Sequence, residues 1–356
     1  ASSAAPIAPN TSAPIVPTEG NADGLPTFPN ETEMLVMPFT AFVSQQRICK
    51  SIKAWREKAL KEGALVDFGG TTGYEHCIFI SHTWWDRDFK DASNDPSNPY
   101  DRGAPDWQQG EHKDLKWRVV VAAVRTLCQQ KGWAEAKVAL WLDWQSIYQD
   151  DNEMKGKGVR SLIHWATRCD AMLVPTDEAQ VSARWPEKIA GYGSRGWCRA
   201  EYFIFSLWSA IVGREGEVEL YAASTDGALK RFEKVVFQGG YANDMPEQGD
   251  FSVEADRAVV KGLQDSMIRA FGPAVIRQKC EGKPKEVKLN SKMLLAEHMP
   301  VLVRQIEGGA LAECTKLELD SNSIGDEGAK VLAAALPSMS KLEKLYLFNN
   351  SIGDEG

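Results

Sequence analysis

The stretch Cys77-Ile78-Phe79-Ile80-Ser81 places apolar side chains on four consecutive positions. A strand with one face in water alternates apolar and polar side chains, so this run predicts a strand that is buried on both faces. Similar runs recur at residues 138–142, 171–174 and 218–222, and segments with helical periodicity lie at 115–128, 159–167, 197–212 and 253–271. This alternation predicts an α/β domain with a parallel sheet and helices on both faces. The polar stretch 86–111 is predicted to be a long loop after the first strand.

The composition is typical of a globular protein, since 43% of the 356 residues are hydrophobic and 25% are charged. The formal net charge of −8 disfavours non-specific nucleic-acid binding. Every apolar run is far shorter than the roughly 20 residues that a membrane-spanning helix needs. We therefore expect partners that are neither nucleic acid nor membrane.

The seven cysteines are widely scattered, and none forms a Cys-x-x-Cys pair, so the sequence predicts no metal site. Cys77, Cys128 and Cys169 lie in apolar patterns that are typical of buried free thiols. Free thiols indicate a reducing compartment, and we expect a cytoplasmic location.

Composition divides the chain into four regions. Residues 1–32 are rich in Ala, Pro and Ser and are predicted to form a disordered arm. Residues 33–74 are predicted to form a helical lead-in, residues 75–280 the α/β domain, and residues 281–356 a repeat segment.

The repeat segment shows a leucine pattern that recurs after 28 residues, from 317 to 345. Leucines on a short strand pack against the neighbouring coil, and an asparagine bonds the backbone at the turn. The repeat-forming residues are Leu317, Leu319, Asn322, Leu345, Leu347 and Asn350. The pattern resembles leucine-rich repeats of the ribonuclease-inhibitor-like class, and it predicts the start of an α/β solenoid with a protein-binding surface.

Residues 287–311 are expected to form an irregular first repeat or a cap. Because a solenoid needs about three stacked repeats, we expect a truncated chain whose longer parent continues the repeats. We also expect the 356-residue chain alone to be prone to aggregation.

Polar and aromatic side chains gather where the predicted strands end. Ser81, His82 and Trp84 follow the first strand, whereas Asp143 and Trp144 follow the second. Ligands of open parallel sheets bind beyond the carboxyl ends of the strands, so we predict that these residues line one crevice.

A glycine-rich loop at residues 191–196 leads into the helix that begins at Trp197. Its spacing formally matches a dinucleotide fingerprint, but no strand precedes it, so the match is weak. A phosphate at this helix start, bound by Arg195 and Arg199, stays open as an interpretation.

The ordered set of motifs between Ile78 and Glu201 resembles a Toll/interleukin-1 receptor (TIR) domain. The matching pieces are Ile78-Phe79-Ile80-Ser81, Trp141-Leu142-Asp143, the segment from Arg168 to Pro175, and Trp197-Cys198-x-x-Glu201. The insertion at 86–111 and the loop at 149–158 depart from the family pattern, so the chain resembles a divergent member. The resemblance implies a flavodoxin-like fold and an intracellular signalling role related to innate immunity.

Some TIR domains hydrolyse NAD with a glutamate four residues after the tryptophan of this helix, and Glu201 occupies that position here. The resemblance therefore implies an NAD hydrolase with NAD as substrate, no bound cofactor, and Glu201 as the catalytic residue. A carboxylate suits this reaction because it stabilises an oxocarbenium-like transition state. The nucleotide-binding residues are expected to be Ser81, His82, Trp84, Asp143, Trp144, Arg195 and Trp197.

We expect Glu201 to be kept ionised by the positive potential of the first helical turn. Each candidate also has a structural interpretation, since acids favour first turns without any ligand and clustered tryptophans are mostly core. The alternative function is a non-catalytic module that self-associates while the repeats bind a protein. A third is a nucleoside-processing enzyme that resembles deoxyribosyltransferases, which a second carboxylate facing Glu201 would favour.

Overall fold

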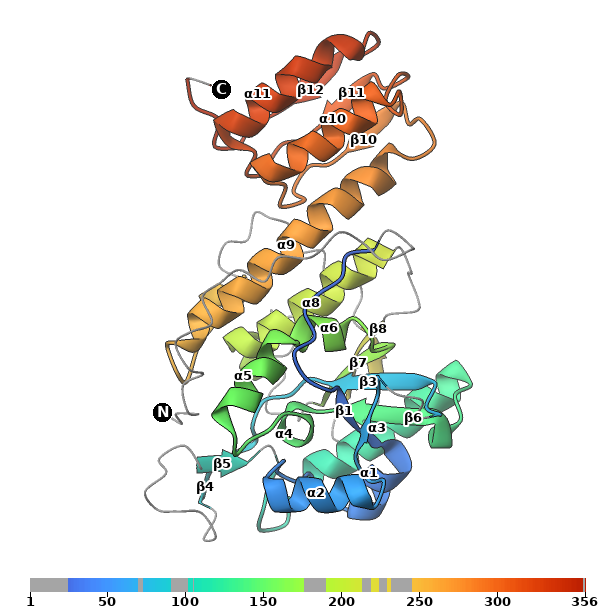
Figure 1. Ribbon diagram of the computed structural model, residues 1–356, viewed down its shortest axis with the longest axis vertical. Helices are drawn as coiled ribbons and strands as arrows, with labels where there is room; N and C mark the ends of the chain where they lie inside the picture. Colours follow the sequence, from blue (N-terminus) through green and yellow to red (C-terminus); the bar gives the residue numbers. More distant parts are fainter. Residues whose placement is uncertain are drawn as a thin grey trace.

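The computed structural model describes residues 25–69, 73–90, 102–104, 106–175, 190–212, 219–223, 229–231, 245–354 and 356. It contains a mixed α/β part followed by a smaller unit of parallel strands and helices (Figure 1). The α/β part comprises β1 (Leu35–Pro38), α1 (Phe39–Gln45), α2 (Lys53–Lys61), β2 (Val66–Asp67), β3 (His76–Ile80), β4 (Asp86–Lys90), β5 (Arg102–Ala104), α3 (Leu115–Lys131), β6 (Val138–Trp141), α4 (Asp143–Ser146), α5 (Asn152–Arg160), α6 (Leu162–Ala166), β7 (Ala171–Pro175), α7 (Ala190–Gly193), α8 (Gly196–Val212), β8 (Glu219–Ala223), β9 (Leu229–Arg231) and α9 (Asp256–Cys280).

The main sheet has the strand order β2-β1-β6-β3-β7-β8-β9 within the described residues. Strands β6, β3, β7 and β8 run parallel to one another. They correspond to the four apolar runs, so the predicted parallel core of the sheet is confirmed. The whole sheet is mixed, however, because β1, β2 and β9 pair in antiparallel fashion at its two sides.

Both faces of the sheet are buried, as the continuous apolar runs predict. Cys77 and Phe79 of β3 belong to a core that includes α6, α8 and α9. Ile78 and Ile80 belong to a second core, which α1 and α3 complete on the opposite face. Helices therefore cover both faces of the sheet (Figure 1).

The predicted helical lead-in at 33–74 also supplies two strands of the sheet. Val36 of β1 pairs with Val66 of β2, and Met37 pairs with Leu140 of β6. The helical part is divided into α1 and α2 rather than forming one helix. This region is therefore an integral edge of the α/β part.

The end of the predicted disordered arm is ordered. Residues 1–24 lie outside the described residues, but residues 25–32 pack against the α/β part. Phe28 is 7% exposed and makes an edge contact with Trp208 of α8. Glu31 binds the Arg160 guanidinium through two oxygens, with N–O distances of 2.6 and 2.8 Å. These contacts correct the predicted boundary of the arm.

The predicted loop at 86–111 contains secondary structure. Strands β4 and β5 form a two-stranded antiparallel sheet, whereas residues 91–101 and 105 lie outside the described residues. Asp106 then starts the approach to α3, because its carboxylate accepts the amides of Lys116 and Trp117 at 2.8 and 2.7 Å.

The repeat segment contains β10 (Glu286–Lys288), α10 (Met299–Glu307), β11 (Lys316–Glu318), α11 (Gly325–Ala335) and β12 (Lys344–Tyr346). Its strands are parallel, with Val287 opposite Leu317 and Leu317 opposite Leu345. The 28-residue offset is confirmed as a strand register. The segment predicted to be an irregular first repeat or a cap supplies a strand and a helix of the same unit, because β10 pairs with β11 and leads to α10.

Two asparagines join successive turns of the repeat segment. Asn322 Oδ1 accepts the amides of Lys292 and Leu294 at 2.9 and 3.0 Å, and its Nδ2 donates to the carbonyls of Leu289 and Leu319. Asn350 Nδ2 likewise donates to the carbonyls of Leu319 and Leu347. Each amide therefore satisfies backbone groups of its own turn and of the preceding one, as the motif predicts.

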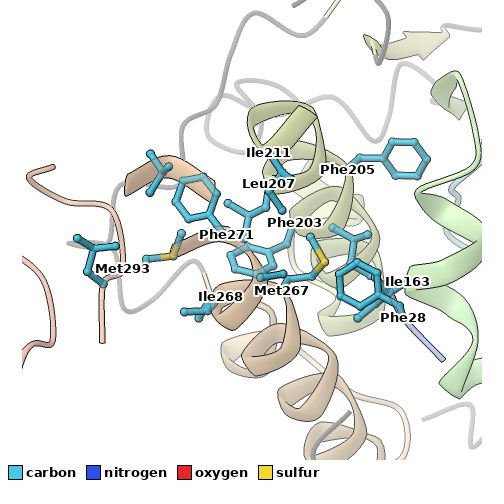
Figure 2. Packing of buried hydrophobic residues seen from close by; sticks show 14 of the residues in the cluster. Phe28, Ile163, Phe203, Phe205, Leu207, Ile211, Met267, Ile268, Phe271 and Met293 are labelled. Carbon is cyan, nitrogen blue, oxygen red and sulfur yellow. The ribbon is translucent and has the colours of Figure 1, made fainter. Parts of the chain in front are cut away.

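Helix α9 links the two parts through one apolar core. Figure 2 shows Phe203 and Leu207 of α8 beside Met267 and Phe271 of α9. The same core continues into the leucines of the repeat segment. Gly272 of α9 packs so closely on the His298 ring that a β-carbon there would overlap it.

Candidate functional site

A cavity of about 160 Å³ lies at the carboxyl ends of β3 and β6. These neighbouring parallel strands pair Phe79 with Trp141, so the residues that follow them meet at one edge of the sheet. The predicted site residues that line the cavity are His82, Trp84, Asp143, Trp144, Arg195, Trp197 and Glu201. The eighth, Ser81, lies behind Glu201 and contacts it directly.

Glu201 is buried, with 8% of its surface exposed, and Ser81 Oγ donates a hydrogen bond to its Oε2. The Ser81 hydroxyl has one proton, so the phenol of Tyr192, 2.6 Å from Ser81 Oγ, donates to it in turn. Burial raises the pKa of Glu201 well above its ordinary value, and the nearby Asp143 raises it further.

The raised pKa opposes the expectation that Glu201 is kept ionised. Helix α8 begins at Gly196, so Glu201 lies beyond its first turn, where the positive potential of the helix is weaker. Desolvation outweighs the single hydrogen bond that favours the charged form. Burial therefore favours the protonated form of Glu201 more than it is favoured in an exposed glutamate.

Asp143, which begins α4, has the opposite electrostatic balance. Its side chain is 41% exposed, and His82 Nε2 lies 3.0 Å from its Oδ1. Burial raises its pKa, but His82, the Trp144 amide and the more distant Lys116 together lower it below the ordinary value. The cavity thus contains one acid whose pKa is raised, Glu201, and one whose pKa is lowered, Asp143.

Tryptophans form much of the cavity wall. Trp84 and Trp144 meet edge to face, with ring centroids 4.9 Å apart. Trp197 donates its indole N–H to Asp256 Oδ2 at 3.0 Å, and Asp256 also lines the cavity. Trp85, in contrast, is 4% exposed and belongs to the core on the other face of the sheet. It does not line the cavity.

The glycine-rich loop has a packing explanation. A β-carbon on Gly196 would overlap the Phe251 ring, and the Gly196 amide donates to the Asp250 carbonyl at 3.1 Å. Arg195 lines the cavity and contacts Ser252, whereas Arg199 donates to the carbonyls of Gly193 and Met245. Arg199 therefore supports the loop, and the interpretation in which it binds a phosphate loses its support.

Three charged residues of the site, Lys116, Lys155 and Asp256, were missed from the sequence, and Lys155 lines the cavity. Lys116 is fully buried, and its Nζ lies 3.2 Å from His82 Nδ1. Asp256 is 6% exposed and supplies a further carboxylate to the cavity. Both lie on apolar helical stripes, Lys116 four residues before Val120 and Asp256 four residues before Val260. A charge on such a stripe is a usable signal, because that face is buried.

The described residues contain no group of three or more His, Cys, Asp or Glu side chains arranged to hold a metal ion. Each of their helices is too short or too polar to cross a lipid bilayer. All seven cysteines are buried free thiols, as predicted for Cys77, Cys128 and Cys169.

A family model described as leucine-rich repeat matches residues 315–333 and 338–356. The chain therefore contains two leucine-rich repeats near its C-terminus. They include the predicted leucines and asparagines, and leucine-rich repeats are consistent with a protein-binding surface. No curated protein and no solved structure matches the chain. The resemblance of the α/β part to TIR domains stays a prediction.

Proposed function

We propose that this protein is a TIR-like signalling protein whose α/β part hydrolyses NAD at the nicotinamide–ribose bond, while its leucine-rich repeats bind a protein partner. The observation that carries the proposal is the position of Glu201, a buried residue that lines a cavity at the strand ends. Asp143, whose pKa is lowered, lines the same cavity.

The strand order supports this proposal. Numbered along the chain, the parallel strands β3, β6, β7 and β8 lie in the order 2-1-3-4, as in flavodoxin-like folds. In such sheets a ligand binds at the carboxyl edge, where successive connections leave to opposite sides. The cavity lies at that edge, next to the end of β3.

The chemistry follows from the two acids. In the reaction the bond between ribose C1′ and the nicotinamide nitrogen breaks, and nicotinamide leaves with the electron pair. A water oxygen then attacks C1′ and releases one proton, which gives ADP-ribose and nicotinamide. Bound nicotinamide carries a positive charge, which favours ionisation of Glu201, and the resulting carboxylate stabilises the oxocarbenium-like state. Asp143 lines the cavity, and its Oδ2 accepts no hydrogen bond within the described residues, which supports a role in accepting a ribose hydroxyl.

The cavity volume supports binding of one ring at a time. A cavity of about 150 Å³ accommodates a benzene-sized group, so the observed 160 Å³ suits the nicotinamide ring, with the remainder of the dinucleotide outside. The indole rings of Trp84 and Trp144 provide the surfaces that attract a cationic ring.

We also propose that the α/β part self-associates and that the protein acts in the cytoplasm. Seven free thiols support a reducing compartment. Both the catalytic function and the alternative function, a non-catalytic scaffold, involve self-association of the α/β part. The buried hydrogen bonds that link Tyr192, Ser81 and Glu201 favour the scaffold. A buried acid with a hydrogen-bond partner is stable in a core without any catalytic role.

The test is NAD consumption by concentrated protein, with Glu201→Gln and, as a matched control, Glu327→Gln on α11, whose side chain is 84% exposed. We expect turnover in the wild type and in the control, and a loss of at least about 100-fold in Glu201→Gln. Undetectable turnover in an assembled wild type, verified by sedimentation, would refute the hydrolase and leave the scaffold.

A nucleoside-processing enzyme is the third candidate, and Asp256 favours it because it places another carboxylate in the cavity with Glu201. Replacing NAD with purine and pyrimidine nucleosides in the same assay separates the two enzymes. Base release from nucleosides without NAD turnover would select this candidate.

A further inference from the structure

Lys116, near the start of α3, is a fully buried lysine with 0% exposure. Its ammonium donates to the Thr83 carbonyl, lies 3.2 Å from His82 Nδ1, and sits 4.6 Å from the centre of the Trp85 ring. Burying an ammonium group is costly unless it is paired and hydrogen-bonded. Lys116 contacts His82, which lines the cavity, so we ask what this buried charge does for the site.

The surrounding backbone holds Lys116 in this place. The buried Asp106 carboxylate accepts the amides of Trp107, Lys116 and Trp117 at 2.7 to 2.8 Å and so caps the start of α3. Burial raises the pKa of Asp106, and the Lys116 ammonium opposes this rise because it attracts the carboxylate. The lysine is thus positioned by its helix start rather than by a flexible loop.

The contacts of His82 determine which ring nitrogen carries the proton. Asp143 is ionised and can only accept, so His82 Nε2, 3.0 Å from Asp143 Oδ1, carries a hydrogen and donates it. An ammonium can only donate, so His82 Nδ1 accepts from Lys116. Without Lys116, Nδ1 has the Thr83 carbonyl at 3.1 Å as its neighbour, and that oxygen favours a protonated Nδ1.

We propose that Lys116 is a positioning residue of the cavity, which fixes His82 as the Nε2–H tautomer and thereby fixes the orientation of Asp143. His82 Nε2 and the Trp144 amide both bind Asp143 Oδ1. The carboxylate cannot rotate without losing both hydrogen bonds, so Oδ2 stays directed to a ligand. The inference rests on the proposed function only for the identity of that ligand, a ribosyl hydroxyl.

The experiment is nitrogen NMR of the full chain labelled at histidine, recorded without ligand at mildly alkaline pH. The chain has five histidines, and His82→Gln assigns the His82 signals by their loss. An unprotonated ring nitrogen resonates far downfield of a protonated one. We expect the downfield signal at Nδ1 in the wild type and its transfer toward Nε2 in Lys116→Met.

Two further variants separate positioning from general damage. Lys116→Arg keeps a donor and should retain the wild-type tautomer, and Lys113→Met removes an exposed lysine near the same helix start and should change nothing. A wild type with its downfield signal at Nε2 overturns the proposal, and this holds even if Lys116→Met does not fold. An unchanged tautomer in a folded Lys116→Met overturns it as well.

Because the tautomer is measured without substrate, its outcome is independent of NAD turnover. Absence of turnover with the expected tautomers refutes the proposed function and leaves Lys116 as the positioning residue of a site for another ligand. NAD turnover together with a downfield signal at Nε2 in the wild type supports the proposed function and refutes the positioning role of Lys116.

Discussion

Mild acid should weaken the junction between α9 and the repeat segment, because His298 is buried there as a neutral ring. The residue is 2% exposed, and its Nδ1 accepts the Leu295 amide at 3.1 Å. Its Nε2 has no hydrogen-bond partner within the described residues. Burial lowers the pKa of His298 from 6.5 to about 4.

The sign follows from proton binding. Between pH 6.5 and about 4 the unfolded chain binds a proton at this histidine that the folded chain does not, so stability falls as the pH falls through this window. At 1.36 kcal/mol for each pKa unit, the full loss is about 3 kcal/mol, and about 2 kcal/mol is lost near pH 5 relative to pH 7.5. Above pH 6.5 the contribution is fully present.

The assay is urea unfolding, followed by tryptophan fluorescence near pH 7.5 and near pH 5. Other groups titrate in the same range, so the wild type is compared with His298→Gln, which removes only the His298 contribution. His112→Gln is the control, because the His112 side chain is 61% exposed. The wild type should lose about 2 kcal/mol more than His298→Gln. Equal losses in the two proteins would refute the reasoning.

Three other predictions concern the repeats, the α9 junction and the cavity. Asn322→Ala breaks hydrogen bonds to two turns and should lower the free energy of unfolding by about 3 kcal/mol, whereas Asn152→Ala, at an exposed position at the start of α5, should change it little in the same urea titration. Gly272→Ala places a methyl group against the His298 ring and should cost about 1–3 kcal/mol, measured as a lower midpoint of thermal unfolding. The pKa of Glu201 is raised, so its contribution to stability is present below its unfolded pKa and is lost as the pH rises. Glu201→Gln should therefore gain thermal stability relative to the wild type with increasing pH, and a parallel pH dependence would contradict this.

The parts of the fold that were predictable have local signatures. Cys77 to Ile80 form a strand buried on both faces, and four adjacent apolar residues encode that burial without reference to the rest of the chain. The spacing of Leu317, Leu319 and Asn322 encodes a repeat, because the same backbone turn needs the same side chains each time. The grouping of the strand-end residues around one cavity followed from the parallel topology.

The parts that were not predictable depend on tertiary surroundings. Leu35 to Pro38 form a strand between β2 and β6, but a short apolar run fits a strand or a helix equally well. The rise in the pKa of Glu201 was missed because helix position is visible in the sequence and desolvation is not. Lys116 was missed since its partners, His82 and the Thr83 carbonyl, are brought to it only by folding.

Helix α9 has 25 residues and, at 1.5 Å per residue, spans about 37 Å. Its first residue, Asp256, lines the cavity, and its second half is embedded among the leucines of the repeats. Helix α9 therefore contributes side chains to a hydrophobic core that is shared by the α/β part and the repeat segment. Unfolding of either part would expose apolar side chains of the other to water. Heating should accordingly unfold both parts in a single calorimetric transition.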